Sequence, residues 1–433
     1  MMAQSSLESV RISIIGLGYV GLPLALHLAR HFPVVGFDVD EARISELRSG
    51  KDNTGEVLSS ELRGTSVHFS DDRQDIEDAN LFIVTVPTPI DADNEPDLRA
   101  IEAACRLVGS VLNNGSVVVF ESTVYPGVTE DICGPILEAE SGQKCGRDFF
   151  LGYSPERMNP GDREHSVDKI TKVVAGQTPE VANLLEQVYG EVTNGNIFVA
   201  DNIRTAEAAK VIENAQRDIN IAFVNEVSMI FDKLGINTHS VLAAARTKWN
   251  FLNFEPGLVG GHCISVDPFY LAHVARQFGH EPEVILAGRR INDGMAEFMA
   301  EGVARNIGKL LETSTPPRVL VLGITFKENV PDIRNSKSVD LINALVRRGY
   351  QVDAHDAMAD AEETKRHYGI DLLANLDGVS GYDCVVGAVP HGVYRAFNSR
   401  VLVSLLAQGG LLADLKGMWR EIDLGDSYSR WEV

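Results

Sequence analysis

Cysteine is scarce in this chain and follows no pattern. Five thiols occur among 433 residues, with no CxxC pair and no spacing that fits a histidine and cysteine metal site. An odd, scattered set argues against a disulfide framework and against structural zinc, so we expect no metal site. Most such thiols are small core residues, and only its surroundings can single one out from Cys105, Cys133, Cys145, Cys263 and Cys384.

Basic residues are outnumbered by acidic ones, 39 against 61, which gives a formal net charge of -22. A charge of that sign repels nucleic acid and anionic membrane surfaces over long range. We therefore expect neither as a partner. An anionic substrate would have to be held by local donors.

Long apolar runs are missing too. No stretch of about eighteen apolar residues occurs, and residues 1–10 hold neither a basic n-region nor an apolar h-region. We expect a cytoplasmic protein. With 44% hydrophobic and 23% charged residues it has the composition of a globular chain, and its length exceeds what one core usually organises.

The first part of the chain alternates apolar strand signals with helical stretches. Residues 11–15 resemble a buried parallel strand, and a glycine-rich turn leads from them to a helical pattern at 22–30. Further strand signals follow at 34–37, 81–86, 116–121 and 148–153. This βαβ alternation predicts a doubly wound sheet.

The middle of the chain reads as helical. A long run at 205–233 contains neither Gly nor Pro, and a second helical stretch at 283–311 leads to the break Ser314-Thr315-Pro316-Pro317. The long run looks like a central helix between two lobes. Its apolar positions include Ala209, Ile212, Ile219, Phe223 and Val224.

Strand signals resume after the break, without a glycine fingerprint, at 318–323, 351–355, 382–386 and 410–414. We predict an α/β fold of two doubly wound Rossmann-like domains joined by a long central helix and a helical middle domain. A functional cleft is expected between the lobes, facing the carboxyl ends of the strands. The expected domains are residues 1–200, 201–313 and 314–433.

The segment ISIIGLGYVGLP places Gly16, Gly18 and Gly21 in G-x-G-x-x-G register between a strand and a helix. Gly16 permits the tight turn, Gly18 lets the backbone approach a pyrophosphate at the helix N-terminus, and Gly21 allows close helix packing. Tyr19 and Val20 complete the turn. We predict a dinucleotide site here.

The next strand ends at Asp38, twenty residues past Gly18, where a carboxylate can accept hydrogen bonds from ribose hydroxyls. Because the Asp38 carboxylate would repel the 2'-phosphate of NADP, the sequence favours NAD. Arg43 is the one nearby residue that would favour NADP instead. The strand expected to flank the cofactor ribose ends in Thr85, Pro87 and Thr88. Plain topology is the alternative explanation for these three.

The segment PGLVGGHCISVDP carries the clearest chemical signal. Gly260 and Gly261 let the backbone approach a ligand, and Cys263 follows at what we expect to be the start of a helix. A helix N-terminus lowers the pKa of a thiol, and the thiolate is the attacking form, so Cys263 is a candidate nucleophile. Asp267 would share its helix face, although an N-cap before Pro268 is the alternative. A small core cysteine is the alternative for Cys263.

Lys210 and Asn214 lie four residues apart on the central helix, so their polar ends project from one face of an otherwise apolar element. A solvated helix face would explain them equally well. His262 is more readily a substrate or packing contact than a base.

Seven motifs occur in a fixed order along the chain, GLGYVGLP, VPTP, ESTVYPG, SPER, AAKVIENAQRDINIAFVNE, VGGHCISVDP and GITFKENVPDIRNS. Together they resemble the UDP-glucose/GDP-mannose dehydrogenase family over nearly the whole chain. Within it, AARTKWNFLNFEPGLVGGHC is similar to the UDP-N-acetylglucosamine or UDP-N-acetylgalactosamine 6-dehydrogenases of capsule, O-antigen and Vi-polysaccharide synthesis.

The resemblance implies two hydride transfers to NAD, from alcohol to aldehyde and from thiohemiacetal to thioester, and then hydrolysis. Cys263 matches the nucleophile, Lys210 the lysine that stabilises oxyanions, and Asn214 a donor to oxyanion or substrate. The C-terminal lobe would bind the UDP-sugar.

The same comparison assigns Asp267 to water positioning, and Thr123 and Glu156 to the water network and to base catalysis. Which of them removes the alcohol proton stays open. Lys327 and Arg334 would reach both substrate and cofactor.

Further substrate contacts implied by the resemblance include Arg246, which resembles a residue that reaches the sugar of a neighbouring subunit. A homodimer or higher homo-oligomer with the central helix at its interface is therefore expected. The other contacts are Arg157, Phe254, Gly257 and His262.

His262 narrows the set of candidate sugars, because the UDP-glucose members of the family carry serine at the position before the nucleophile. An acetamido sugar is favoured. The sequence does not distinguish gluco from galacto configuration at C4 and does not exclude manno at C2, so UDP-ManNAc and UDP-glucose stay as alternatives. A two-electron β-hydroxyacid dehydrogenase would have no use for Cys263. A non-catalytic sugar-nucleotide sensor is the remaining hypothesis. Two, one or no NADH per sugar would separate the three classes.

Overall fold

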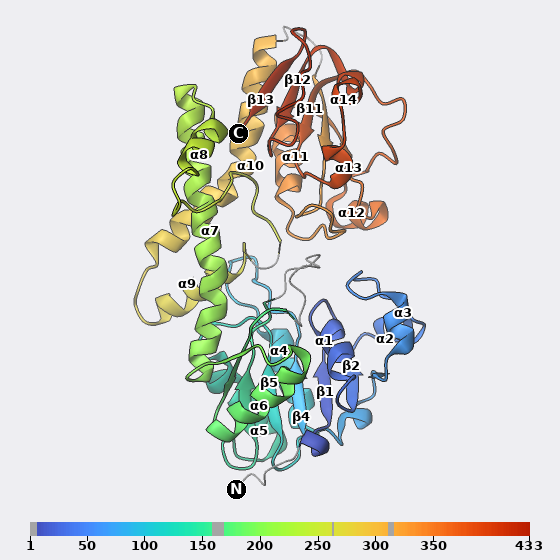
Figure 1. The fold of residues 1–433 in the computed structure, drawn as a ribbon, viewed down its shortest axis with the longest axis vertical. Helices are drawn as coiled ribbons and strands as arrows, with labels where there is room; N and C mark the ends of the chain where they lie inside the picture. Colours follow the sequence, from blue (N-terminus) through green and yellow to red (C-terminus); the bar gives the residue numbers. More distant parts are fainter. Residues whose placement is uncertain (1–6, 158–168, 262–263, 311–315) are drawn as a thin grey trace. The chain divides into compact units, whose positions relative to one another are not determined.

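The structure is a computed structural model, shown in Figure 1. It describes residues 7–157, 169–261, 264–310 and 316–433. The chain divides into two compact units, and each is described by itself. The first comprises Met1–Glu213 and Phe269–His280, and the second comprises Asn214–Pro268 and Glu281–Val433.

The first unit is built on an eight-stranded sheet in the order β3-β2-β1-β4-β5-β6-β7-β8. Neighbouring strands are parallel except β6 and β7, which run antiparallel. The position of β1 beside β4 creates the switch point at which doubly wound sheets bind dinucleotides. The strands are β1 (Ile12–Ile15), β2 (Val34–Phe37), β3 (His68–Ser70), β4 (Leu81–Val84), β5 (Val117–Phe120), β6 (Phe150–Tyr153), β7 (Lys172–Gly176) and β8 (Ile197–Val199).

The central strands of this sheet are buried on both faces. The runs LFIV of β4 and VVVF of β5 are buried at every position, as expected for parallel strands covered by helices on both sides. The covering helices begin at local signals, for example at Thr178, whose hydroxyl accepts the Val181 amide before Pro179. They are α1 (Gly21–Leu28), α2 (Glu41–Arg48), α3 (Ser59–Gly64), α4 (Arg99–Gly109), α5 (Gly134–Ser141) and α6 (Pro179–Val192).

Helix α7 (Ile203–Leu234) continues from the first unit into the second, as its uninterrupted pattern predicts. The prediction of an otherwise apolar element is wrong. Ile212 and Phe223 are 53% and 59% exposed, and the buried positions include the polar residues Glu207, Asp218 and Asn225. Periodicity identifies apolar positions on a helix, but it does not tell a core from a partner surface or an inward polar face.

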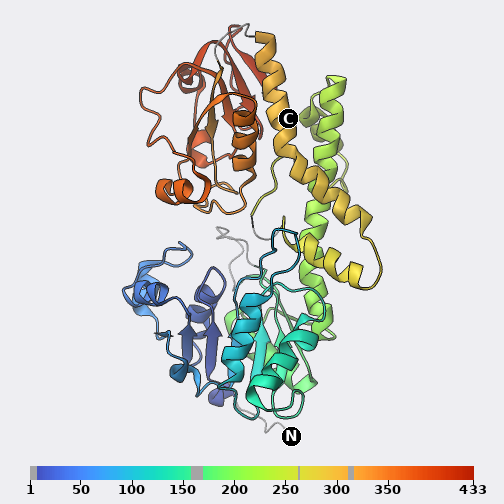
Figure 2. The ribbon, with the colours of Figure 1, turned by 180° about the vertical axis from the view of Figure 1, so that it is seen from behind.

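The second unit contains a parallel sheet of five strands in the order β10-β9-β11-β12-β13. One of its faces is covered by α10 (Glu283–Leu310), as Figure 2 shows, through Met295, Met299, Val303 and Ile307. The strands are β9 (Arg318–Leu322), β10 (Gln351–His355), β11 (Tyr382–Gly387), β12 (Leu406–Asp414) and β13 (Ser429–Glu432). The other helices are α8 (Thr238–Ala245), α11 (Lys337–Arg347), α12 (Ala361–Tyr368), α13 (Gly392–Arg395) and α14 (Ser399–Leu405).

The predicted fold class is confirmed, with two doubly wound α/β sheets and a helical middle region. The sequence patterns missed β3, β7, β8 and β13, of which β3, β8 and β13 are short edge strands. The expected break at 314–317 lies partly outside the described residues, and β9 begins directly after it. None of the helices in the described ranges combines the length and the apolar composition that a membrane-spanning segment needs.

Candidate active site

The glycine turn after β1 has the form that a dinucleotide pyrophosphate requires. Gly16 adopts φ +97°, and its amide donates to the Phe37 carbonyl at 2.8 Å. A Cβ at Gly21 would lie 1.9 Å from the Gly16 carbonyl oxygen, so α1 can approach the turn this closely only with glycine. A Cβ at Gly18 would meet no atom within 4 Å, which leaves the outer side of the turn open to a ligand.

Two charged residues brace this turn. The Asp38 carboxylate, directly after β2, accepts the Leu17 amide at 2.8 Å and the Asp40 amide at 3.0 Å. The Arg43 guanidinium is buried and donates to the Leu17 carbonyl at 3.0 Å, and it pairs with Asp52 at 2.8 Å. Arg43 is thus engaged with its own chain beside the turn, where its charge is balanced by a carboxylate. Tyr19 and Val20 are half-buried directly before α1.

The segment after β4 is fixed from both sides. The Thr85 hydroxyl donates to the Gly16 carbonyl at 2.7 Å, and the Thr88 hydroxyl donates to the Thr123 carbonyl at 2.6 Å. The Tyr270 hydroxyl, from α9 (Asp267–Gln277), donates to the Thr88 carbonyl at 2.7 Å. Pro87 lies exposed between these anchors. Thr85, Thr88 and Thr123 are therefore held together at the carboxyl edge of the sheet.

Glu156 and Arg157 lie after β6 at the same edge. The Glu156 carboxylate is 13% exposed and lies 3.4 Å from the buried ammonium of Lys172. Arg157 pairs with Glu213 at 2.9 Å and donates to the Thr171 carbonyl at 2.9 Å.

Lys210 and Asn214 both lie on the buried side of α7, 8% and 6% exposed, so the solvated-face alternative does not apply. Among the described residues, no hydrogen bond or ion pair engages the Lys210 ammonium. The Asn214 amide donates to the Asp267 carboxylate at 2.5 Å. A buried ammonium without a partner is costly, and this favours a ligand at Lys210.

Asp267 occupies the first position of α9, and residues 264–266 form a turn before it. The expectation that a helix starts at Cys263 and carries Asp267 one turn further on is therefore wrong. Helix periodicity alone did not locate the N-terminus, which lies at the Asp267-Pro268 pair favoured there. Cys263 and His262 themselves lie outside the described residues.

Within the second unit, the glycine loop, residues 257–261, packs against the loop after β9. A Cβ at Gly260 would lie 2.4 Å from the Asn335 carbonyl oxygen, and the Gly261 amide donates to that oxygen at 3.3 Å. Gly261 has φ +86° and faces the Phe326 ring. The two glycines thus allow close backbone approach to another loop of the chain, where the sequence suggested a ligand. The Asn225 side-chain amide forms hydrogen bonds with both the carbonyl and the amide group of Gly257.

The predicted cations of this unit lie in or beside these loops. The Arg334 guanidinium, 42% exposed, pairs with Asp332 at 2.6 Å, and Lys327 precedes it in the same loop. Arg246 donates to the carbonyl of the half-buried Phe254 at 3.2 Å and to the Glu255 carboxylate at 3.1 Å.

The sequence motifs do not include Lys416, which follows β12. A Cβ at Gly257 would lie only 2.0 Å from the Lys416 Nζ atom, so the lysine end takes up the space beside this glycine. The described residues offer the Lys416 ammonium no hydrogen bond or ion pair. Burial lowers the pKa of the Lys416 ammonium, against the attraction of Glu328 and Glu255. The signal that could have found it is its place at the carboxyl end of a parallel strand.

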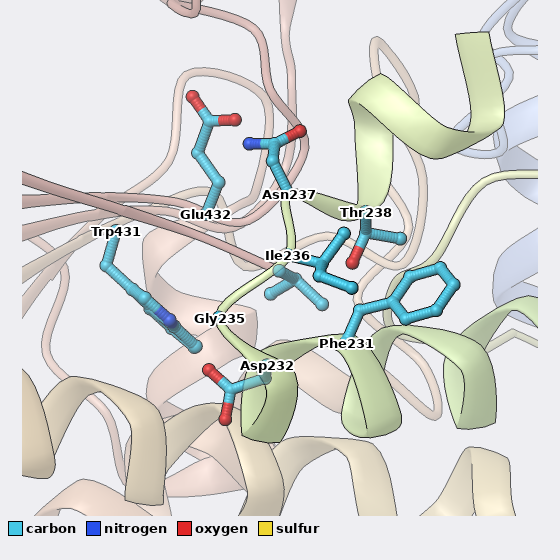
Figure 3. A pocket seen from close by; sticks show the side chains of 9 residues that line it. Phe231, Asp232, Gly235, Ile236, Asn237, Thr238, Trp431 and Glu432 are labelled. Atoms are coloured by element: carbon cyan, nitrogen blue, oxygen red, sulfur yellow. The ribbon is translucent and has the colours of Figure 1, made fainter. Parts of the chain in front are cut away.

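A separate pocket of about 190 Å³ lies in the second unit, between the end of α7 and β13 (Figure 3). It contains none of the predicted site residues and is small for a nucleotide ligand. Within the described ranges, no group of three or more His, Cys, Asp or Glu residues could hold a metal ion. The pocket is lined by Phe231, Asp232, Gly235, Ile236, Asn237, Thr238, Trp431, Glu432 and Val433.

Three domains of one family match the sequence in order. The NAD binding domain of the UDP-glucose/GDP-mannose dehydrogenase family matches residues 10–193, its central domain 204–294 and its UDP binding domain 320–421. Protein CapL of Staphylococcus aureus is 48% identical over 98% of this chain and 99% of its own length. A UDP-N-acetyl-D-glucosamine 6-dehydrogenase of Pseudomonas aeruginosa is 47% identical over 95% of this chain and 97% of its own.

Structural similarity extends over the same length. The structure of a UDP-D-ManNAc dehydrogenase from Pyrococcus horikoshii matches with a TM-score of 0.87 at 29% identity, covering 97% of this chain and 99% of that one. Sequence motifs, sheet order and whole-length similarity agree. The chain therefore belongs to the UDP-glucose/GDP-mannose dehydrogenase family of NAD-dependent dehydrogenases.

Proposed function

We propose that this protein oxidises the C6 hydroxyl of a UDP-N-acetylhexosamine, UDP-GlcNAc or UDP-GalNAc, to the carboxylate for surface polysaccharide synthesis of the capsule or O-antigen type. The observation that carries the proposal is the 47% identity, over 95% of the chain, to an enzyme named for UDP-N-acetyl-D-glucosamine. Relatives named for the manno and the galacto sugar are 32% and 31% identical, so identity favours the gluco sugar, and the galacto sugar is kept from the motif resemblance.

NAD, when bound, accepts a hydride from C6 in each of two oxidations. The first unit would hold it at the glycine turn, through Gly16, Gly18 and Gly21, with Asp38 at the ribose. The open space above Gly18 and the acceptor oxygens of Asp38 support this assignment. Arg43 would act indirectly, through the turn that it braces.

In the first oxidation, Glu156 takes the hydroxyl proton as the C6 hydride leaves, which gives the aldehyde. The Cys263 thiolate then adds to the aldehyde carbon, and loss of the second hydride gives a thioester. Water positioned by Asp267 and Thr123 cleaves the new carbon–sulfur bond, which releases the carboxylate and restores the thiolate. Lys210 and Asn214 stabilise the oxyanions of these steps.

The anionic UDP group needs positive charge in a chain with a net charge of -22. Lys327, Arg334 and the unpaired Lys416 would supply it in the second unit. Arg246 would do so from a neighbouring subunit. Gly257 and Phe254 would contact the sugar.

The test is an assay with NAD and each of UDP-GlcNAc, UDP-GalNAc, UDP-ManNAc and UDP-glucose, with NADH followed by absorbance. We expect two NADH per sugar, and higher rates on UDP-GlcNAc or UDP-GalNAc than on the other two. Faster turnover of UDP-glucose would overturn the substrate assignment. One NADH per sugar would indicate a two-electron dehydrogenase, and none a sensor.

The covalent scheme makes a separate prediction for Cys263→Ser. A serine hydroxyl ionises far less readily than a thiol, so the variant should stall after the first oxidation or turn over at least about 100-fold more slowly. Product analysis by mass spectrometry checks this. Full uronate production by the folded variant would exclude the thioester.

A further inference from the structure

Four titratable side chains of the first unit form a buried cluster around Lys172. The residues Lys172, Glu121 and Tyr189 are 3%, 1% and 0% exposed. The Lys172 ammonium lies 2.7 Å from one Glu121 oxygen and 3.4 Å from the Glu156 carboxylate. The Tyr189 hydroxyl donates to the other Glu121 oxygen at 2.5 Å, and its ring centroid lies 5.4 Å from the ammonium. The lysine is thus held by three neighbours.

Strand direction brings these groups to one place. Glu121 follows β5 and Glu156 follows β6, both at the carboxyl edge of the sheet. Strand β7 runs antiparallel to β6, with Ala175 opposite Tyr153, so its first residue, Lys172, returns to that same edge. In a purely parallel sheet the first residue of the neighbouring strand would lie at the opposite edge.

The charges of the cluster favour a cationic Lys172. Burial lowers the pKa of Lys172, but the attraction of Glu121 and Glu156 outweighs burial, and the net shift is upward. Burial raises the pKa of Glu121, and the pull of Lys172 opposes it. Arg157, the residue after Glu156, pairs with Glu213 at 2.9 Å, so its charge is balanced within the first unit. Glu121 therefore has both oxygens engaged, whereas Lys172 still has a donor for Glu156.

We propose that Lys172, fixed by Glu121 and Tyr189, is a positioning residue that keeps the Glu156 carboxylate ionised and in one orientation for proton abstraction. The idea rests on the proposed function, because that function makes Glu156 the base. Glu121 and Tyr189 are needed because a lysine without them would populate many rotamers and would not keep its ammonium beside Glu156.

The test compares Lys172→Met with Lys172→Arg in the full-length enzyme, with kcat measured against pH. An ammonium beside a carboxylate lowers its pKa, so its removal should move the acid limb of kcat upward by about one pH unit or more. We expect kcat at pH 7 to fall about 10-fold or more, whereas KM for NAD changes little. Lys172→Arg should keep the wild-type midpoint. A folded Lys172→Met with an unchanged midpoint would overturn the proposal.

A matched control is Lys144→Met, because Lys144 pairs with Glu138 at 2.9 Å on the surface of the same unit. Its profile should stay that of the wild type. If Lys172→Met does not fold, Tyr189→Phe provides a milder test, because it removes only the hydroxyl that holds Glu121. It should move the acid limb of the kcat profile to higher pH by less than about one unit, and an unchanged limb would overturn the proposal.

Glu156→Gln separates this inference from the function on which it rests. Failure of the wild type on every UDP-sugar would refute the proposed function itself. Full activity of Glu156→Gln, with the wild type active, would refute the base and this inference but leave the dehydrogenase assignment standing. A strong loss in Glu156→Gln together with the Lys172→Met shift supports both.

Discussion

At the scale of the single residue, Glu207 shows how burial tunes a group near the candidate site. It is fully buried on α7, three residues before Lys210. Its carboxylate accepts the Gly127 amide at 2.6 Å and the Thr129 amide at 3.0 Å, which ties α7 to the segment ESTVYPG. Burial raises the pKa of Glu207 to about 7, although these hydrogen bonds act to lower it. Its charge therefore changes close to neutral pH.

The pKa of Glu207 predicts a loss of stability between about pH 5 and pH 7.5. Its folded pKa lies above the unfolded value near 4.5, so the folded state binds this proton more tightly, and the stabilisation is lost as pH rises through about 7. We expect the free energy of unfolding to fall by about 1–3 kcal/mol from this group. Urea unfolding at both pH values measures it. Glu207→Gln should show a smaller fall, and the same fall in both proteins would contradict the assignment.

At the scale of elements, a buried polar ladder joins α7, α10 and the glycine loop. The Asn225 amide nitrogen donates to the Gly257 carbonyl at 3.1 Å, and its oxygen accepts the Gly257 amide at 2.7 Å. Asn225 also bonds Asn292 at 2.8 Å, Asn292 bonds Asp218 at 2.7 Å, and Asp218 pairs with Arg289 at 2.5 Å. Only an amide supplies the donors and the acceptor that Gly257 and Asn292 require together. The ladder sets the position of a loop that we propose contacts the sugar.

Replacement of Asn225 by Leu should loosen that loop and leave the dinucleotide turn alone. We expect KM for the UDP-sugar to rise about 5-fold or more, and stability to fall by about 1–3 kcal/mol because the backbone groups of Gly257 lose their partners. KM for NAD should stay within about 2-fold. Asn220→Leu is the control on the same helix, because the half-buried Asn220 donates to the Gln216 carbonyl of its own helix at 2.7 Å and is not a member of the ladder. Equal effects on both Michaelis constants would argue against a local role.

At the scale of the whole molecule, the two sheets share one local arrangement, a glycine with positive φ after one strand and an aspartate after the neighbouring strand. Gly323 follows β9 with φ +98°, as Gly16 follows β1 with φ +97°. Asp356 follows β10 and accepts the Ile324 amide at 2.5 Å, as Asp38 follows β2 and accepts the Leu17 amide. In the second unit the carboxylate is also engaged by the buried His391 at 3.1 Å. The same strand geometry therefore recurs without the G-x-G-x-x-G fingerprint.

The oligomer is the prediction that belongs to this scale. Phe223, Ile230 and Leu234 are 59%, 49% and 63% exposed on α7, and their spacing places them on one face. Such a stripe suits the homodimer proposed through this helix. Phe223→Glu should give monomers in sedimentation velocity and lose activity, because Arg246 would no longer reach a neighbouring site.

Val346→Glu is the control for the dimer test, since Val346 is a similarly exposed apolar residue, 52%, on α11. It should sediment and turn over like the wild type. A dimeric Phe223→Glu protein would place the interface elsewhere, and an active monomer would refute the role of Arg246 across subunits.

Several parts of this protein depend only on residues that are neighbours along the chain. The turn at Gly16, the carboxylate at Asp38 and the uninterrupted α7 follow from local φ preferences, spacing and periodicity, and the structure has each where the sequence put it. The same local rules gave the wrong start for α9, because a turn and a first helical residue differ by little in sequence.

Contacts between residues far apart in the chain depend instead on the packed fold. Lys172 reaches Glu121 because β7 reverses direction, and no periodicity in the sequence records that reversal. Asn335 meets Gly260, and Lys416 fills the space beside Gly257, because the segments after the parallel strands β9 and β12 share one edge of the sheet and the loop with these glycines packs against both. Contacts of this kind depend on strand order and direction, which are set by the packing of the whole core.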